Sequence, residues 1–352
     1  RLPEVSEGEH RPQPPGGAST KARLHIVTGK GGTGKTTVAA ALAQALASGG
    51  GRVLLVEVEG RQGIAALLGD PPLPYEEREM ISAPGGGTVC VLAADAESAL
   101  LEYLEMFYGM RRAGQALNRL GAVDFATTIA PGLRDVLLTG KATEAVRRRR
   151  GSRRRTSDAP STEPFHYDAV VMDAPPTGRI AQFLNVNSEV AGLARAGPIR
   201  NHADRVMEVI RSGRTRVHFV SLLEEMPAQE TRDGIAELSE LGIGIGIVLV
   251  NMVRPPLLDE PGLVAAADGG PDLDVLSAGL KEAGLDDPEE LAAALADEVH
   301  AHALRVRLER RVRTGLEDLG RPILELPLVE GGVDRAALDL LARRLIDQGV
   351  RR

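Results

Sequence analysis

Cysteine and aromatic residues are scarce in this chain of 352 residues, and their scarcity excludes several kinds of site. The sequence contains one cysteine, Cys90, and no tryptophan, and aromatic residues make up 3% of it. A single cysteine cannot form a disulfide within the chain or supply the ligands of a cysteine-rich zinc or iron–sulfur centre. We therefore expect a cytoplasmic location, with Cys90 as a core residue of a strand.

Long hydrophobic runs are also absent, although hydrophobic residues make up 43% of the chain and suffice for a core. No apolar stretch approaches the roughly 18 residues that a membrane-spanning helix needs, so a soluble protein is predicted. Residues 1–21 contain Pro and Gly throughout and no apolar segment, which favours a disordered leader over a signal peptide. The net charge of −7 argues against nucleic acid as the main partner.

Lysine is used sparingly and accounts for five of the 42 basic residues. Two of the five, Lys30 and Lys35, lie in one nine-residue segment, GKGGTGKTT, at positions 29–37. The chain prefers arginine elsewhere, so the two lysines indicate that this segment needs compact ammonium groups that a guanidinium does not replace.

That segment matches the phosphate-binding pattern G-x-x-x-x-G-K-[ST]. In this motif the backbone N–H groups of the loop and of the next helix hold the phosphates, Lys35 neutralises their charge, and Thr36 binds Mg²⁺. A predicted strand before the loop and a small-residue helix after it argue against a simple glycine-rich turn. The nucleotide-binding residues assigned from the motif are Gly29, Gly31, Gly32, Thr33, Gly34, Lys35, Thr36 and Thr37.

Strand and helix patterns alternate along the chain and define the predicted fold class. Hydrophobic runs rich in β-branched residues predict strands at 23–28, 52–58, 88–94, 167–173, 217–223, 245–251 and 322–327. Helical periodicity follows the phosphate loop and recurs at about residues 227–241 and 334–349. This alternation predicts an α/β P-loop fold with a doubly wound, mostly parallel sheet, within one domain at residues 22–352.

Two predicted helical insertions elaborate this domain. The second covers residues 253–316 and is acidic, and between the two lies an Arg-, Ser- and Pro-rich segment, residues 147–164, that predicts a disordered loop. This loop is either solvated or in contact with an acidic partner, lipid or insertion. The first insertion covers residues 95–150, and its apolar residues form either a client-binding groove or ordinary helix packing. These residues are Leu100, Leu101, Leu104, Met106, Phe107 and Met110.

A carboxylate for the same Mg²⁺ is expected from Asp173, which ends the predicted strand 167–173 and begins the segment DAPPTG. A Walker-B carboxylate at the carboxyl end of a strand reaches the Mg²⁺ shell. The alternative is that Asp173 only caps the following turn. We therefore predict a site for ATP and Mg²⁺, with Thr36 and Asp173 on the metal.

Together, GKGGTGKTT and DAPPTGR resemble the deviant-Walker P-loop ATPases, specifically the arsenite-pump and tail-anchored-protein-targeting branch, from about residue 23 to the end. The resemblance implies that Lys30 crosses a dimer interface to the partner's nucleotide. It also implies that DAPPTGR is the switch II segment and that Asn251, at the end of a strand, reads the adenine. The alternatives are a solvated loop lysine for Lys30 and a strand-end turn residue for Asn251.

The sequence departs from this family at two places. Where the family has an Asp-Pro-Ala-His run whose Asp positions the attacking water, this chain has VEVEGRQG, with Glu59 at the aligned place. Glu59 either orients water, with slower hydrolysis because its carboxylate is displaced by one methylene, or is a structural or regulatory carboxylate. The CxxC pair that clamps targeting ATPases through zinc is absent, as are the cysteines of an arsenite site.

The resemblance implies an ATP hydrolase that acts as a dimeric conformational switch, with Lys30, Lys35, Glu59 and Asp173 as catalytic residues. The partner subunit is either a second copy or a paralogous ATPase, and the client is a protein or a membrane. One rival is a positioning ATPase of the ParA or MinD type, whose terminal amphipathic helix docks on a membrane instead of packing on the sheet. Another is a nucleotide-binding subunit with little turnover.

Overall fold

A computed structural model describes residues 22–108, 131–150, 163–193, 198–270 and 272–351. Its strands form an eight-stranded sheet in the order β3-β4-β2-β5-β1-β6-β7-β8. Neighbouring strands are parallel except β3 and β4, which are antiparallel. The strands are β1 (Leu24–Gly29), β2 (Arg52–Glu57), β3 (Arg78–Ala83), β4 (Gly87–Ala93), β5 (Ala169–Asp173), β6 (Thr215–Ser221), β7 (Ile245–Val253) and β8 (Ile323–Pro327).

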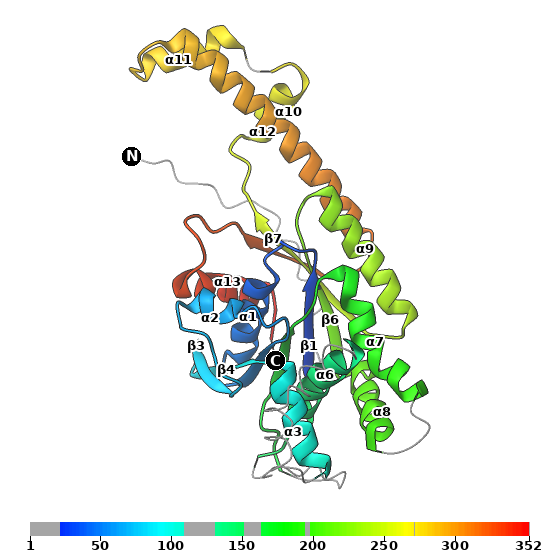
Figure 1. The fold of residues 1–352 in the computed structure, drawn as a ribbon. Helices are drawn as coiled ribbons and strands as arrows, with labels where there is room; N and C mark the ends of the chain where they lie inside the picture. Colours follow the sequence, from blue (N-terminus) through cyan, green and yellow to red (C-terminus); the bar gives the residue numbers. More distant parts are fainter. Residues whose placement is uncertain (1–21, 109–130, 151–162, 194–197, 271, 352) are drawn as a thin grey trace.

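Helices cover both faces of the sheet, with α1, α2 and α13 on one face and α6, α7, α8 and α9 on the other (Figure 1). The predicted fold class, a doubly wound and mostly parallel sheet, is therefore confirmed. The helices that the structure describes are α1 (Lys35–Ala47), α2 (Gly63–Leu68), α3 (Ala96–Tyr108), α6 (Pro131–Arg147), α7 (Thr177–Leu193), α8 (Pro198–Arg211), α9 (Glu225–Glu240), α10 (Glu260–Asp268), α11 (Leu273–Glu282), α12 (Pro288–Glu317) and α13 (Arg335–Asp347).

The central strands are apolar on both faces, as a parallel sheet between two helical layers requires. All six residues of β1 are buried. Leu24 and Ile26 belong to the core that includes α7, α8 and α9, whereas Val27 belongs to the core that includes α1 and α13. Successive side chains of a strand point to opposite faces, so one short segment anchors both helical layers.

Several strands relevant to function end at the same edge of the sheet, because parallel strands share a direction. β1 runs into the phosphate loop and pairs with β5, so that Val27 lies opposite Asp173. β2 pairs with the other side of β5 and places Glu57 opposite Asp173. Strand pairing therefore brings together three chain segments that are far apart in the sequence.

Helices α10, α11 and α12 form an arm that projects from the sheet beyond β7 (Figure 1). They lie within residues 253–316, where a helical insertion was predicted, and α12 ends one residue beyond it. The 30 residues of α12 span about 45 Å, given a rise of about 1.5 Å per residue. A small core joins α10 to α12 near the base of the arm and consists of Leu263, Ala266, Ala267, Ala303 and Val306.

Four elements were not predicted from the sequence: β3, α2, α7 and α8. In β3 only Ile81 and Ala83 are buried, because it is an edge strand, and its sequence REMISA lacks a clear alternating pattern. Helix α2 has six residues, too few for helical periodicity to show. These elements are therefore stabilised by the strands and helices they pack against.

The predicted disordered loop, 147–164, is covered only in part, since residues 151–162 lie outside the described residues. At its start the prediction of a solvated loop is wrong. The Arg148 guanidinium donates to Glu77 at 2.8 Å and to Glu144 at 2.6 Å, and Glu77 also accepts from the Tyr167 hydroxyl at 2.7 Å. Glu77 lies 71 positions before Arg148, so no local sequence pattern indicates this pairing.

The terminal helix α13 packs on the domain with its apolar side, as one of the two sequence interpretations requires. Its buried residues include Leu338, Leu341 and Leu345, in the same core as α1. Cys90 is buried within β4, as predicted. In the described ranges no helix is both long and apolar enough to cross a membrane.

Two other predictions fall largely outside the described residues. The leader, residues 1–21, is one of them. The other is the apolar cluster of the first insertion, in which Leu100 is buried. The side chains of Leu104, Met106, Phe107 and Met110 lie outside the description.

Candidate functional site

Two glycines allow the chain to turn from β1 into α1. At Gly29, the last residue of β1, a Cβ would lie 2.2 Å from a carbonyl oxygen of β6, so only glycine fits there. Gly34 precedes α1 with a φ of 81°, in the left-handed region, and a Cβ there would lie 2.5 Å from Nδ2 of Asn251. Thr33 closes the loop by donating from Oγ1 to the carbonyl oxygen of Lys30 at 2.9 Å.

The start of α1 fits the phosphates of a nucleotide. In the described part of the chain no side chain caps this helix, so the N–H groups of its first turn remain available to a ligand, next to the positive end of the helix dipole. A Cβ at Gly31 or Gly32 would meet no atom within 4 Å, so there is open space at the tip of the loop. Lys35 begins α1 and is 9% exposed, which places a largely desolvated ammonium beside the same amides.

A hydrogen bond joins the two residues predicted to bind Mg²⁺. Oγ1 of Thr36 donates to Oδ2 of Asp173 at 2.7 Å. The pKa of Asp173 is raised to about 7, mainly by burial and also by the nearby carboxylates of Glu57 and Glu59, whereas Thr36 and Lys35 lower it. A buried carboxylate with acidic neighbours favours a bound cation.

These oxygen ligands fit Mg²⁺. Within the described ranges no three His, Cys, Asp or Glu side chains converge as a separate metal site. Mg²⁺ binds through one or two protein oxygens and takes the rest of its shell from phosphate and water, which matches the pair Thr36 and Asp173.

Glu57 is a site residue that the sequence analysis missed. Its side chain is 2% exposed, and its two carboxylate oxygens accept from the backbone N–H groups of Gly63 at 2.9 Å and Ile64 at 3.2 Å, at the start of α2. Glu59, the predicted water-positioning residue, lies beyond the end of β2, and its ion pair among the described residues is a long contact of 3.9 Å with Arg61. The signal for Glu57 was a charged residue that ends a buried strand.

Lys30, the second lysine of the loop, forms an ion pair with Glu230 on α9. The other carboxylate oxygen of Glu230 accepts from Oγ1 of Thr177, the first residue of α7, at 2.6 Å. Hydrogen bonds from Lys30 and from Thr177 lower the pKa of Glu230. Lys30 is therefore not a solvated loop lysine in this structure, and Glu230, 200 positions away, was not predicted.

Asn251 contacts the phosphate loop itself. Its Nδ2 donates to the carbonyl oxygen of Thr33 at 2.9 Å, and the side chain is buried. This contact differs from the strand-end turn role that was the alternative in the sequence analysis. The predicted role in reading adenine stays a prediction.

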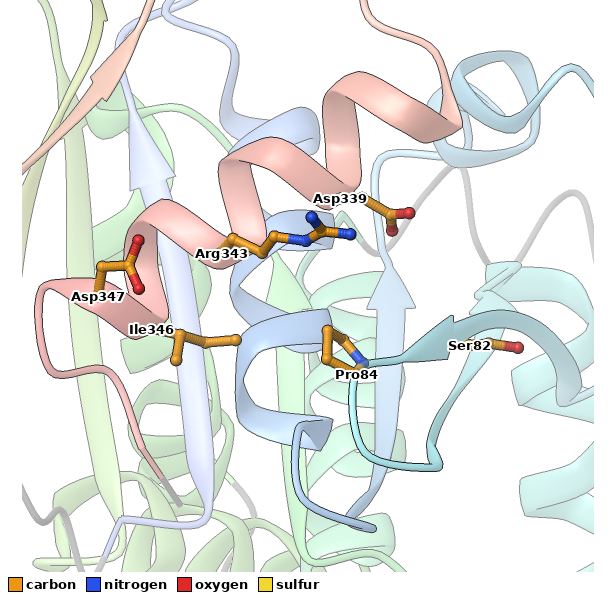
Figure 2. Close-up of a pocket in the computed structure, with 6 residues that line it drawn as sticks. All are labelled: Ser82, Pro84, Asp339, Arg343, Ile346 and Asp347. Carbon is orange, nitrogen blue, oxygen red and sulfur yellow. The ribbon is translucent and has the colours of Figure 1, made fainter.

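A separate cavity of about 420 Å³ lies between α13 and the end of β3 (Figure 2). Pro84 follows the antiparallel strand β3, so the cavity lies toward the amino ends of the parallel strands, away from the phosphate loop. Beside it Gln44 of α1 is fully buried and donates to Asp339. The residues that line the cavity are Ser82, Pro84, Asp339, Arg343, Ile346 and Asp347.

The fold and this geometry define a P-loop nucleotide-binding protein: a strand, a glycine loop and a helix hold one lysine and one threonine beside a strand-end aspartate. Residues 24–260 match the family model described as the CobQ/CobB/MinD/ParA nucleotide binding domain. The chain belongs to this family.

The chain is also similar to individual proteins, among them two that are ATPases by name. It is 50% identical over 329 residues to ATPase BagA of Mycobacterium tuberculosis (strain H37Rv), and the matched region covers 94% of each chain. It is 26% identical over 255 residues to the arsenical pump-driving ATPase of Acidiphilium multivorum, which covers 68% of this chain and 41% of that protein. The second similarity confirms the resemblance to arsenite-pump ATPases that the sequence motifs indicated.

Proposed function

We propose that the protein is a Mg²⁺-dependent ATP hydrolase that acts as a dimeric conformational switch and couples ATP turnover to a protein or membrane client. Family membership and the names of the relatives support nucleotide binding and ATPase activity. The dimer and the coupling to a client are inferences from Lys30.

The ion pair between Lys30 and Glu230 carries this proposal, because it connects the phosphate loop to α7. Glu230 binds Lys30 with one oxygen and Thr177 with the other, and Thr177 lies in the segment that resembles switch II. The Lys30 side chain is 33% exposed, in contrast to the buried Lys35, so a second subunit can approach it. If Lys30 leaves Glu230 for the partner's nucleotide, Glu230 keeps its bond to Thr177 but no longer ties α7 and α9 to the phosphate loop, so these helices can move relative to the loop.

The remaining site residues have distinct tasks in this proposal. Lys35 and the first amides of α1 bind and neutralise the phosphates, and Thr36 and Asp173 hold Mg²⁺, which neutralises charge on the transferred phosphoryl group. Asn251 uses Nδ2 to brace Thr33, which leaves its Oδ1 as the acceptor for the amino group of adenine.

A nucleotide-binding subunit with little turnover is the second candidate function. The observation that favours it is that two backbone N–H groups hold the carboxylate of Glu57, whereas Glu59 has no hydrogen bond to the backbone among the described residues. A paralogous ATPase as partner would then supply the catalytic carboxylate. The burial of Leu338 and Leu341 argues against the other rival, membrane docking through α13.

We also place the protein in the cytoplasm in this proposal, because its substrate is ATP and its one cysteine needs no oxidising compartment. The similarity to an arsenical pump-driving ATPase supports a membrane-associated client. Arsenite itself is not the cargo in this proposal, since one cysteine does not make an arsenite site.

Two lysine variants test the proposal. Lys35→Ala is expected to abolish ATP binding in calorimetry, because it removes the ammonium beside the phosphates. Lys30→Ala is expected to keep ATP binding but to lose both hydrolysis and association in the presence of Mg²⁺ and a non-hydrolysable ATP analogue, measured by light scattering. Lys281→Ala, a lysine of the distant arm, serves as the control and is expected to behave as the parent. Full turnover in Lys30→Ala would contradict the trans-acting lysine, and binding by Lys35→Ala would contradict the phosphate loop.

A further inference from the structure

Exposed aliphatic side chains are concentrated on the arm. Among the described residues, eleven large hydrophobic side chains are exposed, and eight of them lie between residues 257 and 308. Helix α11 has no buried residue at all, and Val275 on it is 68% exposed. The eight residues are Leu257, Val264, Leu273, Val275, Leu285, Leu291, Leu304 and Leu308. Isolated exposed leucines are ordinary on protein surfaces, but such a concentration marks an interaction surface.

The charges of the arm divide it into two parts. At its base, acidic residues are neutralised within the chain by the ion pairs of Arg307 with Asp268 and of Arg310 with Glu260. The arm tip, defined as residues 272–298, has nine acidic residues and one basic residue, Lys281. In the described part of the chain none of the nine carboxylates forms an ion pair. The tip is therefore an uncompensated acidic surface with exposed aliphatic residues.

The charge of the tip decides what kind of partner fits it. An anionic membrane or a nucleic acid would be repelled by the nine carboxylates, although the aliphatic residues alone would suit a membrane. A second copy of this chain has no general excess of positive charge, since the whole chain has a net charge of −7. A partner that matches both features presents apolar side chains flanked by Lys or Arg.

A helix is the partner element that best matches the shape of the tip. Helix α11 has ten residues, about 15 Å in length, and packs against α12, so the tip presents helical ridges and grooves. An amphipathic helix lays its apolar face along such a surface, and its basic residues then pair with carboxylates of the tip.

We propose that the arm tip is a docking surface for a basic amphipathic helix of a partner protein. The exposed residues Leu273, Val275, Leu285 and Leu291 supply its apolar contacts. The surrounding carboxylates select for basic partners and accelerate their association. This inference does not depend on the ATPase mechanism, because no residue of the tip belongs to the nucleotide site.

Synthetic peptides test the proposal with the full chain. The probe is a fluorescent helical peptide with Leu on one face and Lys on the other. Its controls have Glu in place of Lys, or Ser in place of Leu. Fluorescence anisotropy at about 50 mM and about 500 mM NaCl separates the apolar from the electrostatic part of binding. We expect that only the Lys/Leu peptide binds, and that it binds more weakly at the higher NaCl concentration.

Variants of the tip locate the binding site. The double change Leu273→Ser and Val275→Ser is expected to weaken peptide binding about tenfold, because both apolar contacts are lost. The triple change Glu282→Gln, Asp286→Asn and Glu290→Gln is expected to weaken it at low salt and to flatten the salt dependence. All five positions are exposed, so the fold is expected to persist, which circular dichroism checks.

Matched controls lie away from the arm tip. Leu340→Ser removes an exposed leucine of α13, and the triple change Glu237→Gln, Glu240→Gln and Glu317→Gln removes the same amount of charge from α9 and the end of α12. Both are expected to bind the Lys/Leu peptide as the parent does.

Four outcomes would overturn the proposal. The first is that the Lys/Leu and Glu/Leu peptides bind equally well, and the second is that the Lys/Ser and Lys/Leu peptides do. The third is that the tip variants and the control variants lose the same amount of peptide affinity, and the fourth is that no peptide binds. Light scattering and sedimentation with anionic vesicles complete the test. Self-association or vesicle binding that the tip variants abolish would assign the surface to a second copy or to a membrane instead.

Discussion

Glu230→Gln is the change that most directly tests how Lys30 is held. Glutamine has nearly the shape of glutamate and can still accept from Thr177, so α9 and α7 keep their contact. What is lost is the charge that holds the Lys30 ammonium. The variant therefore separates the ion pair from the packing around it.

The size of the effect follows from the exposure of the pair. The side chains of Lys30 and Glu230 are 33% and 31% exposed, so solvent screens their attraction. Partly exposed ion pairs contribute at most about 1 kcal/mol. A free energy of about 1 kcal/mol changes an equilibrium about fivefold, so the fraction of molecules with a released Lys30 is expected to rise by up to that factor.

Two measurements report this change. Sedimentation velocity with Mg²⁺ and a non-hydrolysable ATP analogue is expected to show association of Glu230→Gln that is up to about fivefold tighter. Calorimetry is expected to show unchanged ATP affinity of the single subunit, because Lys35, Thr36 and Asp173 are untouched. Glu225→Gln, an exposed residue of the same helix, is the control and is expected to match the parent.

Two results would contradict the proposed restraint of Lys30 by Glu230. Unchanged association would show that the ion pair does not compete with dimer formation. Weaker association would show that Glu230 places Lys30 for its role instead of restraining it. In both cases the dimeric switch would need a different trigger.

Three further changes are predicted from the site and the core. Asp173→Asn is expected to weaken Mg²⁺-dependent ATP binding about tenfold or more in calorimetry. Because the pKa of Asp173 is raised to about 7, ionisation of the buried carboxyl costs the parent protein folding free energy as the pH rises from 4 to 7. Asp173→Asn has no such group, so its free energy of unfolding is expected to fall less over this range. Burial lowers the pKa of His25 to about 4, so this residue is expected to reduce the free energy of unfolding as the pH falls from 6.5 to 4. In urea titrations over this range, the free energy of unfolding of His25→Leu is expected to fall by about 1.4 kcal/mol less per pH unit than that of the parent. Gly34→Ala is expected to reduce ATP affinity and stability because of its positive φ and the nearby amide of Asn251, whereas Gly31→Ala, with open space, is expected to keep its stability in thermal unfolding.

Some residues of the site were predicted from the sequence, and others were not. Thr36 and Asp173 were paired from two separate motifs, and the structure brings them to 2.7 Å. Glu59 was assigned from its aligned place and stays a prediction, whereas the position of Glu57 opposite Asp173 depends on where β2 ends and on how it pairs with β5. Strand register sets both, and a single sequence does not state register.

The same reason explains the miss at Glu230. It lies in an unremarkable stretch of α9, and nothing local distinguishes it from Glu225 or from the other acidic residues of that helix. Its role arises because β1 and β6 are neighbours in the sheet, which brings α9 over the phosphate loop. Arg148 was misread for a similar reason, since its partner Glu77 precedes β3, an element without a sequence signal.

The sequence by itself determined the phosphate loop, the alternation of strands and helices and hence the fold class. These depend on local properties: glycine at positions that accept no Cβ, hydrophobic period, and the order of strand, loop and helix. Only the tertiary structure decided which carboxylate faces Asp173, which residue holds Lys30, and that α13 buries its apolar side while α11 buries no residue. Those outcomes depend on contacts between residues far apart in the chain, and such contacts leave no pattern in the segments that make them.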